Sequence, residues 1–428
     1  MNFTTHKCLA NNTMSLFILF RKYTVFVLLL LLSGLAYGAT KDATGYLLNP
    51  LQISSEARLS VLTVGPGNPL YAMFGHTAIR LQDPVYQKDI VYNYGTFDFE
   101  TSFFALKFLY GNLNYFLSKS SFELFAKQNQ ALGRFIEEQV LNLSPKEIYA
   151  LVKDMETELV SENRYYRYEF FSNNCTTKVR DLLARYRLFT PSQVTIATPT
   201  DTTFRGLLRP YLQRRPWIRF GINLLLGAPA DYTADNWQQT YLPYMFYQSL
   251  SEAGLNNSDR PLVSDTRLLI PERPFVATPY WLSPVPVFWI LLVFTALFTL
   301  LDFLNKADGK WLDRLLFGTV GLVGLILLPV SLLSLHEPLQ PNWNLLWVLP
   351  THLFIVVGVT RWQQKLWFRY YLWAALVLHA SLLAGWYFIP QQLPEPVVLL
   401  VLALVIRITY RLFQSQQIPF RQVVESQL

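Results

Sequence analysis

The sequence predicts an α+β soluble domain followed by an α-helical membrane domain, and three observations support this. Of its 428 residues, 52% are hydrophobic and 15% aromatic, which is more apolar than an ordinary soluble protein. Short alternating segments fill the first part, and long apolar segments fill the last third. We therefore expect a signal peptide at 1–38, an extracytoplasmic domain at 39–284, and a five-helix membrane domain at 285–428 with a short cytoplasmic tail.

The N-terminus has the pattern of a secretory signal. Arg21 and Lys22 precede the apolar run Val25–Leu32, and Ala36 and Gly38 offer a small-residue cleavage site. This pattern predicts that the domain following it is exported.

The net charge of +7 is unevenly distributed. Residues 1–38 hold three Lys or Arg and no acid, whereas 39–284 hold 24 basic and 23 acidic residues. The excess positive charge therefore belongs to targeting and membrane topology, and no nucleic-acid partner is expected.

The extracytoplasmic domain is predicted to begin with strands. Arg58–Val64 and His76–Leu81 both alternate, and Asp83 and Pro84 form a turn towards Asp89–Tyr94. In the second strand, alternation places Thr77, Ile79 and Leu81 on one face and His76, Ala78 and Arg80 on the other. The second and third strands are expected to form an antiparallel hairpin.

Further elements follow this hairpin. Residues 101–133 are rich in Phe and Leu and are predicted to be helical, and Arg134–Leu143 is a predicted strand. Ser144, Pro145 and Glu147 occupy the N-cap, first and third positions of a predicted helix.

Cys175 is predicted to open a helix. Asn174 is a good N-cap, and Val179 and Leu182 recur at helical spacing. Unpaired first-turn N–H groups and the helix dipole favour a thiolate there. Cys8 precedes the predicted cleavage site, so Cys175 would be the only cysteine of the mature chain, without a disulfide partner. The alternative is a buried cysteine acting as a small hydrophobic residue, but the helix start favours a nucleophile.

His76 is the only histidine between 39 and 284, and it pairs naturally with Cys175 as a general base. A structural histidine at a strand start is the alternative. Asn93 and Asp98 are candidates to orient the imidazole, with Asn93 preferred. Because no His or Cys pair has ligand spacing, no metal site is expected, and no cofactor motif is present.

The last third contains five apolar segments, each a candidate membrane span. They lie near 285–304, 315–335, 345–359, 371–389 and 397–413.

Positive charge alternates between the connections of these segments. Residues 305–314 and 360–370 contain Lys and Arg, whereas 336–344 and 390–396 contain none. The positive-inside rule then places 39–284 outside and the C-terminus in the cytoplasm.

Polar residues also occur at the outer side of the membrane domain. His336, Asn342, Asn344 and His352 surround the predicted start of the third span. Such residues are functional hypotheses by default, here a substrate-binding region. Helix capping at the membrane interface is the equal alternative. For Arg214–Leu226, a helix on the membrane surface and a core helix with a basic edge are likewise equal alternatives.

Several motifs resemble one family. They are F-G-H-T-A-I-R-L at 74–81, Y-N-Y-G-T-F-D-F at 92–99, F-F-S-N-N-C-T-T-K-V-R-D-L-L at 170–183, and H-E-P-L-Q-P-N-W-N-L-L-W-V-L-P-T-H-L at 336–353. Together with five spans, they resemble the Lnb lipoprotein N-acyltransferase family over nearly the whole mature chain. The order of His before Cys also resembles the permuted papain-like, NlpC/P60-related fold of lecithin–retinol acyltransferase relatives.

The resemblance implies an acyltransferase of the bacterial inner membrane whose catalytic domain faces the periplasm. Cys175 would be its nucleophile and His76 its base, while Arg180 and Asp181 would hold the Cys helix or assist the site. Lys178 stands where the family is expected to have Arg.

The resemblance also implies the substrates. Diacylated lipoproteins would be acceptors, and either phospholipid or the lipoprotein's own diacylglyceryl group would donate the acyl chain. Two other classes are considered. A cysteine peptidase or amidase of the cell envelope would use the same Cys–His pair without needing five spans. A non-catalytic envelope scaffold would not need that pair.

Overall fold

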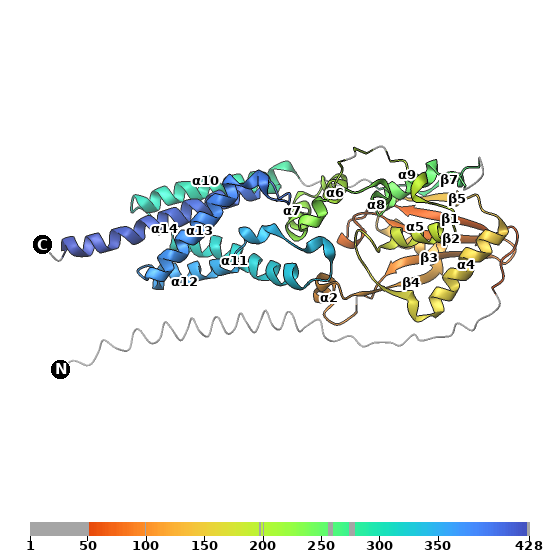
Figure 1. The fold of residues 1–428 in the computed structure, drawn as a ribbon, viewed down its shortest axis with the longest axis horizontal. Coiled ribbons are helices and arrows are strands. Elements are labelled where there is room, and N and C mark those ends of the chain that lie inside the picture. The colour runs from red at the N-terminus through yellow and green to blue at the C-terminus, as the bar shows by residue number, and fades with distance from the viewer. Residues whose placement is uncertain are drawn as a thin grey trace. The chain divides into compact units, whose positions relative to one another are not determined.

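The computed structural model describes residues 51–98, 100–196, 198–199, 201–255, 260–273 and 279–425, with the side chains of 104, 105 and 416–425 left out. The predicted signal peptide and Cys8 lie outside the described residues. The described residues within 51–97 and 105–425 belong to one compact unit, and the described residues within 98–104 do not. The architecture is a soluble domain built on an antiparallel sheet, followed by a five-helix membrane domain (Figure 1).

The soluble domain is organised around an antiparallel sheet of seven strands in the order β6-β4-β3-β2-β1-β5-β7. The strands are β1 (Arg58–Val64), β2 (His76–Asp83), β3 (Lys88–Thr96), β4 (Asn114–Ser121), β5 (Ile136–Leu141), β6 (Tyr165–Arg167) and β7 (Val263–Ile270). The central strand β2 pairs with both β1 and β3, in a register that places Val64 opposite His76 and Tyr92 opposite Ile79. The predicted hairpin is confirmed.

One sequence prediction was wrong. The region 101–133 is not helical throughout, because it contains β4 between the short helix α2 (Phe104–Tyr110) and α3 (Phe122–Ala131). In β4, Tyr115 and Leu117 are buried at alternate positions, and the strand is paired on both sides by β3 and β6. Long-range pairing therefore overrides the local helical tendency of this Phe- and Leu-rich segment.

The two faces of the sheet carry different helices. α5 (Cys175–Arg185) packs on β2 and β3, where the hydroxyls of Thr77 and Thr176 lie 3.1 Å apart. α3 covers the opposite face, where Ala78 and Phe125 share a hydrophobic cluster. α4 (Pro145–Val160) begins at the predicted capping box. The predicted alternation of β2 is confirmed, since its odd and even residues contact different helices.

The remaining helices of the soluble domain follow α5. They are α6 (Phe204–Leu212), α7 (Pro216–Leu225), α8 (Asn236–Gln239) and α9 (Pro243–Glu252). Phe220, Leu224 and Leu225 of α7 pack on the hydrophobic core of the membrane domain. The Phe220 ring meets Phe288 edge-on at 5.4 Å. α7 is therefore a packed helix whose apolar face contacts protein.

Five segments of the described chain are long and apolar enough to cross a membrane. They are Pro284–Phe303 (α10), Lys310–Leu333 (α11), Glu337–Arg361, Leu366–Ala384 (α13) and Val397–Ser415, the last within α14 (Val397–Glu425). α14 packs on both α10 and α13, and α11 packs on α12 (Leu353–Arg361). The third segment is irregular, because three short 3-10 turns precede α12. The orientation predicted from Lys and Arg remains a prediction.

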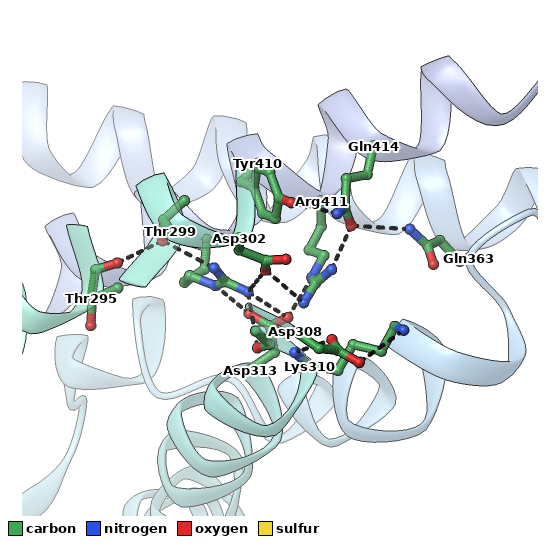
Figure 2. A network of polar contacts seen from close by, with 12 residues as sticks. Thr295, Thr299, Asp302, Asp308, Lys310, Asp313, Gln363, Tyr410, Arg411 and Gln414 are labelled. Carbon is green, nitrogen blue, oxygen red and sulfur yellow. Dashed lines mark hydrogen bonds and ion pairs between the residues drawn. The ribbon is translucent and has the colours of Figure 1, made fainter. Parts of the chain in front are cut away.

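A buried ionic cluster joins three of these helices (Figure 2). Arg407 of α14 is 0% exposed. Its guanidinium donates to Asp313 of α11 at 2.6 Å, to Asp302 of α10 at 3.2 Å and to Thr299 at 3.0 Å. Arg411, one turn later, also pairs with both carboxylates. Two cations therefore balance two anions at the ends of α10 and α11.

Candidate functional site: a cysteine and a histidine at the end of the sheet

Cys175 is the first residue of α5, as predicted. The Asn174 side chain caps the helix by accepting from the backbone N–H groups of Thr176 and Thr177 at 2.8 and 2.9 Å. Asn174 is itself held by donation to the Phe170 and Tyr241 carbonyls. Cys175 is 8% exposed. The cap thus fixes the position of the sulfur and places it at the positive end of the helix dipole.

His76 is the first residue of β2. It follows Gly75, whose φ of +86° is a left-handed conformation that favours glycine. His76 Nε2 lies 2.5 Å from Asn93 Oδ1 on the neighbouring strand. An amide oxygen only accepts, so Nε2 carries the proton and Nδ1 is left with the lone pair of a base. The preferred orienting residue, Asn93, therefore lies beside the imidazole, whereas Asp98 bonds the backbone N–H of Glu100.

Cys175 and His76 meet beside Gly95. Gly95 has no side chain, and both residues border the space that a side chain would fill. The position of a β-carbon on Gly95 lies 3.4 Å from Cys175 Cβ and 3.9 Å from His76 Cε1. Burial on its own raises the pKa of the thiol. The charge of His76 and its hydrogen bond, aided by bonds from the Thr77 backbone and the Thr176 hydroxyl, bring that pKa down from 9.0 to about 7. The site therefore holds a large fraction of nucleophilic thiolate at neutral pH.

This electrostatic balance predicts the pH dependence of alkylation. The thiolate is the reactive form, so the rate of Cys175 alkylation by iodoacetamide should rise with pH to a midpoint near 7. In His76→Ala the lowering contributions of His76 are lost while burial remains, so the midpoint should move well above 7. Arg185→Gln, at the exposed end of α5, should leave the midpoint unchanged. A wild-type midpoint near 9 would contradict the Cys–His contact.

Three tyrosines that the sequence analysis did not single out line the thiol. Tyr115 and Tyr168 stack at 4.4 Å between ring centroids, and Tyr166 follows at 6.4 Å from Tyr115. Burial first, and then the negative charge of Cys175, raise the pKa of all three phenols. These tyrosines are therefore neutral donors beside the sulfur. The aromatic run before Cys175 was the available signal.

Tyr166 lies beside Gly95, which also neighbours Cys175 and His76. Its hydroxyl lies against the backbone of Gly95, 3.8 Å from the point where a β-carbon would sit. Its O–H has no acceptor among the described residues. A buried hydroxyl with a free proton beside a nucleophile is suited to binding an oxyanion.

Arg180 and Asp181 lie further along α5. Arg180 donates to Asp181 at 2.8 Å and to the Trp237 carbonyl at 3.1 Å, and its guanidinium lies 4.4 Å from the Trp237 ring centroid. These contacts tie α5 to α8, and the role predicted for Arg180 and Asp181 stays a prediction. Lys178 lies over the Tyr166 ring at 4.4 Å.

His336 connects the membrane domain to the soluble domain. Its Nε2 lies 2.9 Å from the Phe108 carbonyl of α2, and its Nδ1 lies 3.5 Å from the Glu169 carboxylate. Glu169 exchanges two backbone hydrogen bonds with Asn173, just before Cys175. His336 thus contacts the loop that leads into the Cys helix.

The other three outer polar residues have different partners. Asn342 and Asn344 donate to the last carbonyls of α7, at 2.9 Å to Leu225 and 3.1 Å to Leu224. His352 is fully buried, and its ring nitrogens contact Tyr371 at 3.0 Å and His379 at 3.4 Å. The two asparagines thus act as helix caps for α7. A substrate-binding role for the four residues stays a prediction. No group of three or more metal-binding side chains occurs among the described residues.

Taken together, the fold and site define a multi-pass membrane protein with a folded Cys–His domain outside its spans. Residues 52–209 match the family model described as the Lnb N-terminal periplasmic domain, and residues 277–418 match the Lnb transmembrane domain. The chain therefore belongs to the Lnb family, which is the lipoprotein N-acylation family. Searches of curated proteins and of solved structures returned no match. Family membership suggests an acyltransferase with a periplasmic domain.

Proposed function

We propose that this protein transfers a fatty acyl chain to the N-terminal amine of the lipid-modified cysteine of lipoproteins, through a thioester on Cys175. The observation that carries the proposal is a helix-capped thiol that lies with His76 beside Gly95, and whose pKa is lowered to about 7 by that imidazole, which Asn93 orients. An amine attacks a lipid ester poorly, and a thioester intermediate divides the transfer into two easier steps.

In the first step the Cys175 thiolate attacks the ester carbonyl of the donor lipid. The carbonyl oxygen becomes an oxyanion, and the tetrahedral intermediate collapses as the C–O bond breaks. His76, protonated at Nδ1 by the thiol proton, returns that proton to the departing lyso-lipid oxygen. The acyl chain remains on sulfur.

Two groups are available to bind the oxyanion. The Asn174 cap occupies the N–H groups of Thr176 and Thr177, which leaves the Cys175 N–H without an acceptor among the described residues. The Tyr166 hydroxyl is the second donor. One backbone and one side-chain donor are a sufficient oxyanion hole for acyl transfer.

In the second step the lipoprotein amine attacks the thioester. His76 Nδ1 accepts a proton from the attacking nitrogen, an amide bond forms, and the C–S bond breaks to release the Cys175 thiolate. The relation to a permuted papain-like fold is part of the same proposal, because β2 carries the base, β3 its orienting amide, and a later helix the nucleophile.

The test uses the purified full chain with a donor lipid and no acceptor. We expect the peptide containing Cys175 to gain the mass of one acyl chain, which hydroxylamine removes. Adding a diacylated lipopeptide should then free the thiol and yield an N-acylated lipopeptide. Cleavage of a peptide bond in the acceptor would instead indicate an amidase, and no change in either molecule would indicate a scaffold.

A further inference from the structure

The short helix α2 of the soluble domain is bound to the end of a membrane span (Figure 1). A helix leaves its last four carbonyls without intrahelical partners. Three of these carbonyls in α2 are bound by residues 334–336, which directly follow α11. The bonds are the Leu335 N–H to the Tyr110 carbonyl at 2.7 Å, the Ser334 hydroxyl to the Leu109 carbonyl at 2.7 Å, and the His336 ring to the Phe108 carbonyl at 2.9 Å.

This contact sets the depth of α2. The span α11 has 24 residues. A helix of that length measures about 36 Å, whereas the hydrocarbon core of a bilayer is about 30 Å thick, so the ends of α11 lie at the headgroup level. Leu332 and Leu333 in its last turn are exposed, as lipid-facing side chains are. Ser334 is the next residue, so α2, to which it is bound, lies at the surface of the bilayer.

Exposed aromatic side chains mark the same level on two other spans. Tyr280 and Trp281 directly precede α10, and Tyr387 and Phe388 follow α13. Because consecutive spans alternate in direction, the start of α10 and the ends of α11 and α13 lie on one side of the membrane. Tyrosine and tryptophan are enriched where a membrane meets water. The soluble-domain side of the membrane domain therefore carries an interfacial aromatic belt, and α2 is joined to the spans at that level.

The side chains of α2 suit this position. Leu106 is 65% exposed and Tyr110 is 45% exposed. They are one helical turn apart and therefore share a face. The sequence of α2, F-A-L-K-F-L-Y, has one cation, Lys107, and no acid. An apolar face beside a cation is favoured at a surface of acyl chains and phosphate headgroups.

We propose that α2 is a membrane-surface helix, and that Leu106 and Tyr110 insert into the bilayer leaflet next to the soluble domain. The partner of this surface is the lipid bilayer. The inference goes beyond acyl transfer, because it concerns how the soluble domain is held. In the chain α2 lies between β3, which carries Asn93, and β4, which carries Tyr115. Insertion of α2 therefore holds the candidate site beside the lipids.

The first test measures depth in the full chain, reconstituted in phosphatidylcholine vesicles. Cys8→Ser and Cys175→Ser remove the natural thiols, and a fluorescent label is attached to Leu106→Cys. We expect strong quenching by lipids that carry a nitroxide near the top of the acyl chain, and weak quenching by iodide present on both sides of the membrane. Leu297→Cys, an exposed position within the span α10, is the membrane control. Lys146→Cys, an exposed position at the start of α4, is the water control.

Two results would overturn the insertion of α2. One is a label at position 106 that iodide quenches as strongly as the label at position 146. The other is a label that neither quencher reaches, which would show that a second copy or another segment of this chain covers α2. Tyr110→Cys repeats the measurement one turn away, so the test does not depend on the accumulation of a single variant.

The second test links α2 to the site and rests on the proposed function. Thioester formation on Cys175 is measured with a lipid donor in vesicles and with a water-soluble short-chain ester. In Leu106→Asp the ratio of the two rates should fall about 10-fold, as the lost burial of one large apolar side chain implies. Lys146→Asp should keep the wild-type ratio. An unchanged ratio in Leu106→Asp would overturn the role of α2 in holding the site beside the lipids. Failure of the wild type to form a thioester with either donor would overturn the proposed function, while the depth of the label still decides whether α2 inserts.

Discussion

Replacing Cys175 by alanine is expected to reduce lipoprotein N-acylation to background. The thiol is the proposed site of covalent attachment, and no other cysteine occurs in the described residues. Removal of a covalent nucleophile costs on the order of 10⁶ in kcat in a well-studied hydrolase. The readout is the mass of lipopeptides made by cells whose only copy carries the substitution, together with the acyl-enzyme mass of the purified protein.

Three further variants make this result interpretable. Cys175→Ser keeps the shape of the side chain, in a slightly smaller form, but replaces an acidic nucleophile by a weakly acidic hydroxyl, so it should also be inactive. His76→Ala retains the thiol, but its rate of lipoprotein N-acylation should fall roughly 10²- to 10⁴-fold, the usual contribution of a general acid–base group. Arg185→Gln should remain active and serves as a control for the effect of a substitution on expression. Wild-type acylation by Cys175→Ala would refute the thioester mechanism.

The individual strands and helix starts were predictable because they depend on patterns among residues that are neighbours in the sequence. β1 has the predicted bounds Arg58–Val64, and β2 begins at His76, since alternation is a property of neighbouring residues. The capping boxes at Ser144 and Asn174 were equally local. β4 was missed because its identity depends on β3 and β6, which lie far away in the sequence.

In the candidate site, too, some residues could be predicted from the sequence and others could not. The helix start at Cys175 and the histidine on a strand could be paired by elimination, since each was the only residue of its type in the extracytoplasmic domain. Tyr166 could not, because its place in the site arises from burial against Gly95, far away in the sequence.

The membrane domain shows the same limit. Its five spans follow from hydropathy, but the partners of His352 and Arg407 follow from helix packing. Asn342 and Asn344 were expected near the third span, and capping was the stated alternative. They do cap a helix, but that helix is α7 of the soluble domain, more than a hundred residues earlier in the chain.

Replacing Arg407 by alanine is expected to destabilise the membrane domain severely. Arg407 is fully buried and links α14 to Asp302 of α10 and Asp313 of α11. Its removal leaves one buried arginine, Arg411, to neutralise two buried carboxylates. Breaking a buried ion pair in this way costs about 3–5 kcal/mol. We expect a lower thermal midpoint in detergent and less protein in the membrane.

A matched control and a double variant identify the cause. Lys310→Ala removes a largely exposed ion pair with Asp308, which lies next to this cluster where α11 begins. Its loss should lower the free energy of unfolding by at most about 1 kcal/mol. Arg407→Met combined with Asp313→Leu removes one charge of each sign, so it should be more stable than Arg407→Ala, because no excess carboxylate remains buried. If Arg407→Ala had the same thermal midpoint as Lys310→Ala, the cluster would not hold the three helices together. If the double variant were less stable than Arg407→Ala, specific hydrogen bonds rather than charge balance would account for the stabilisation.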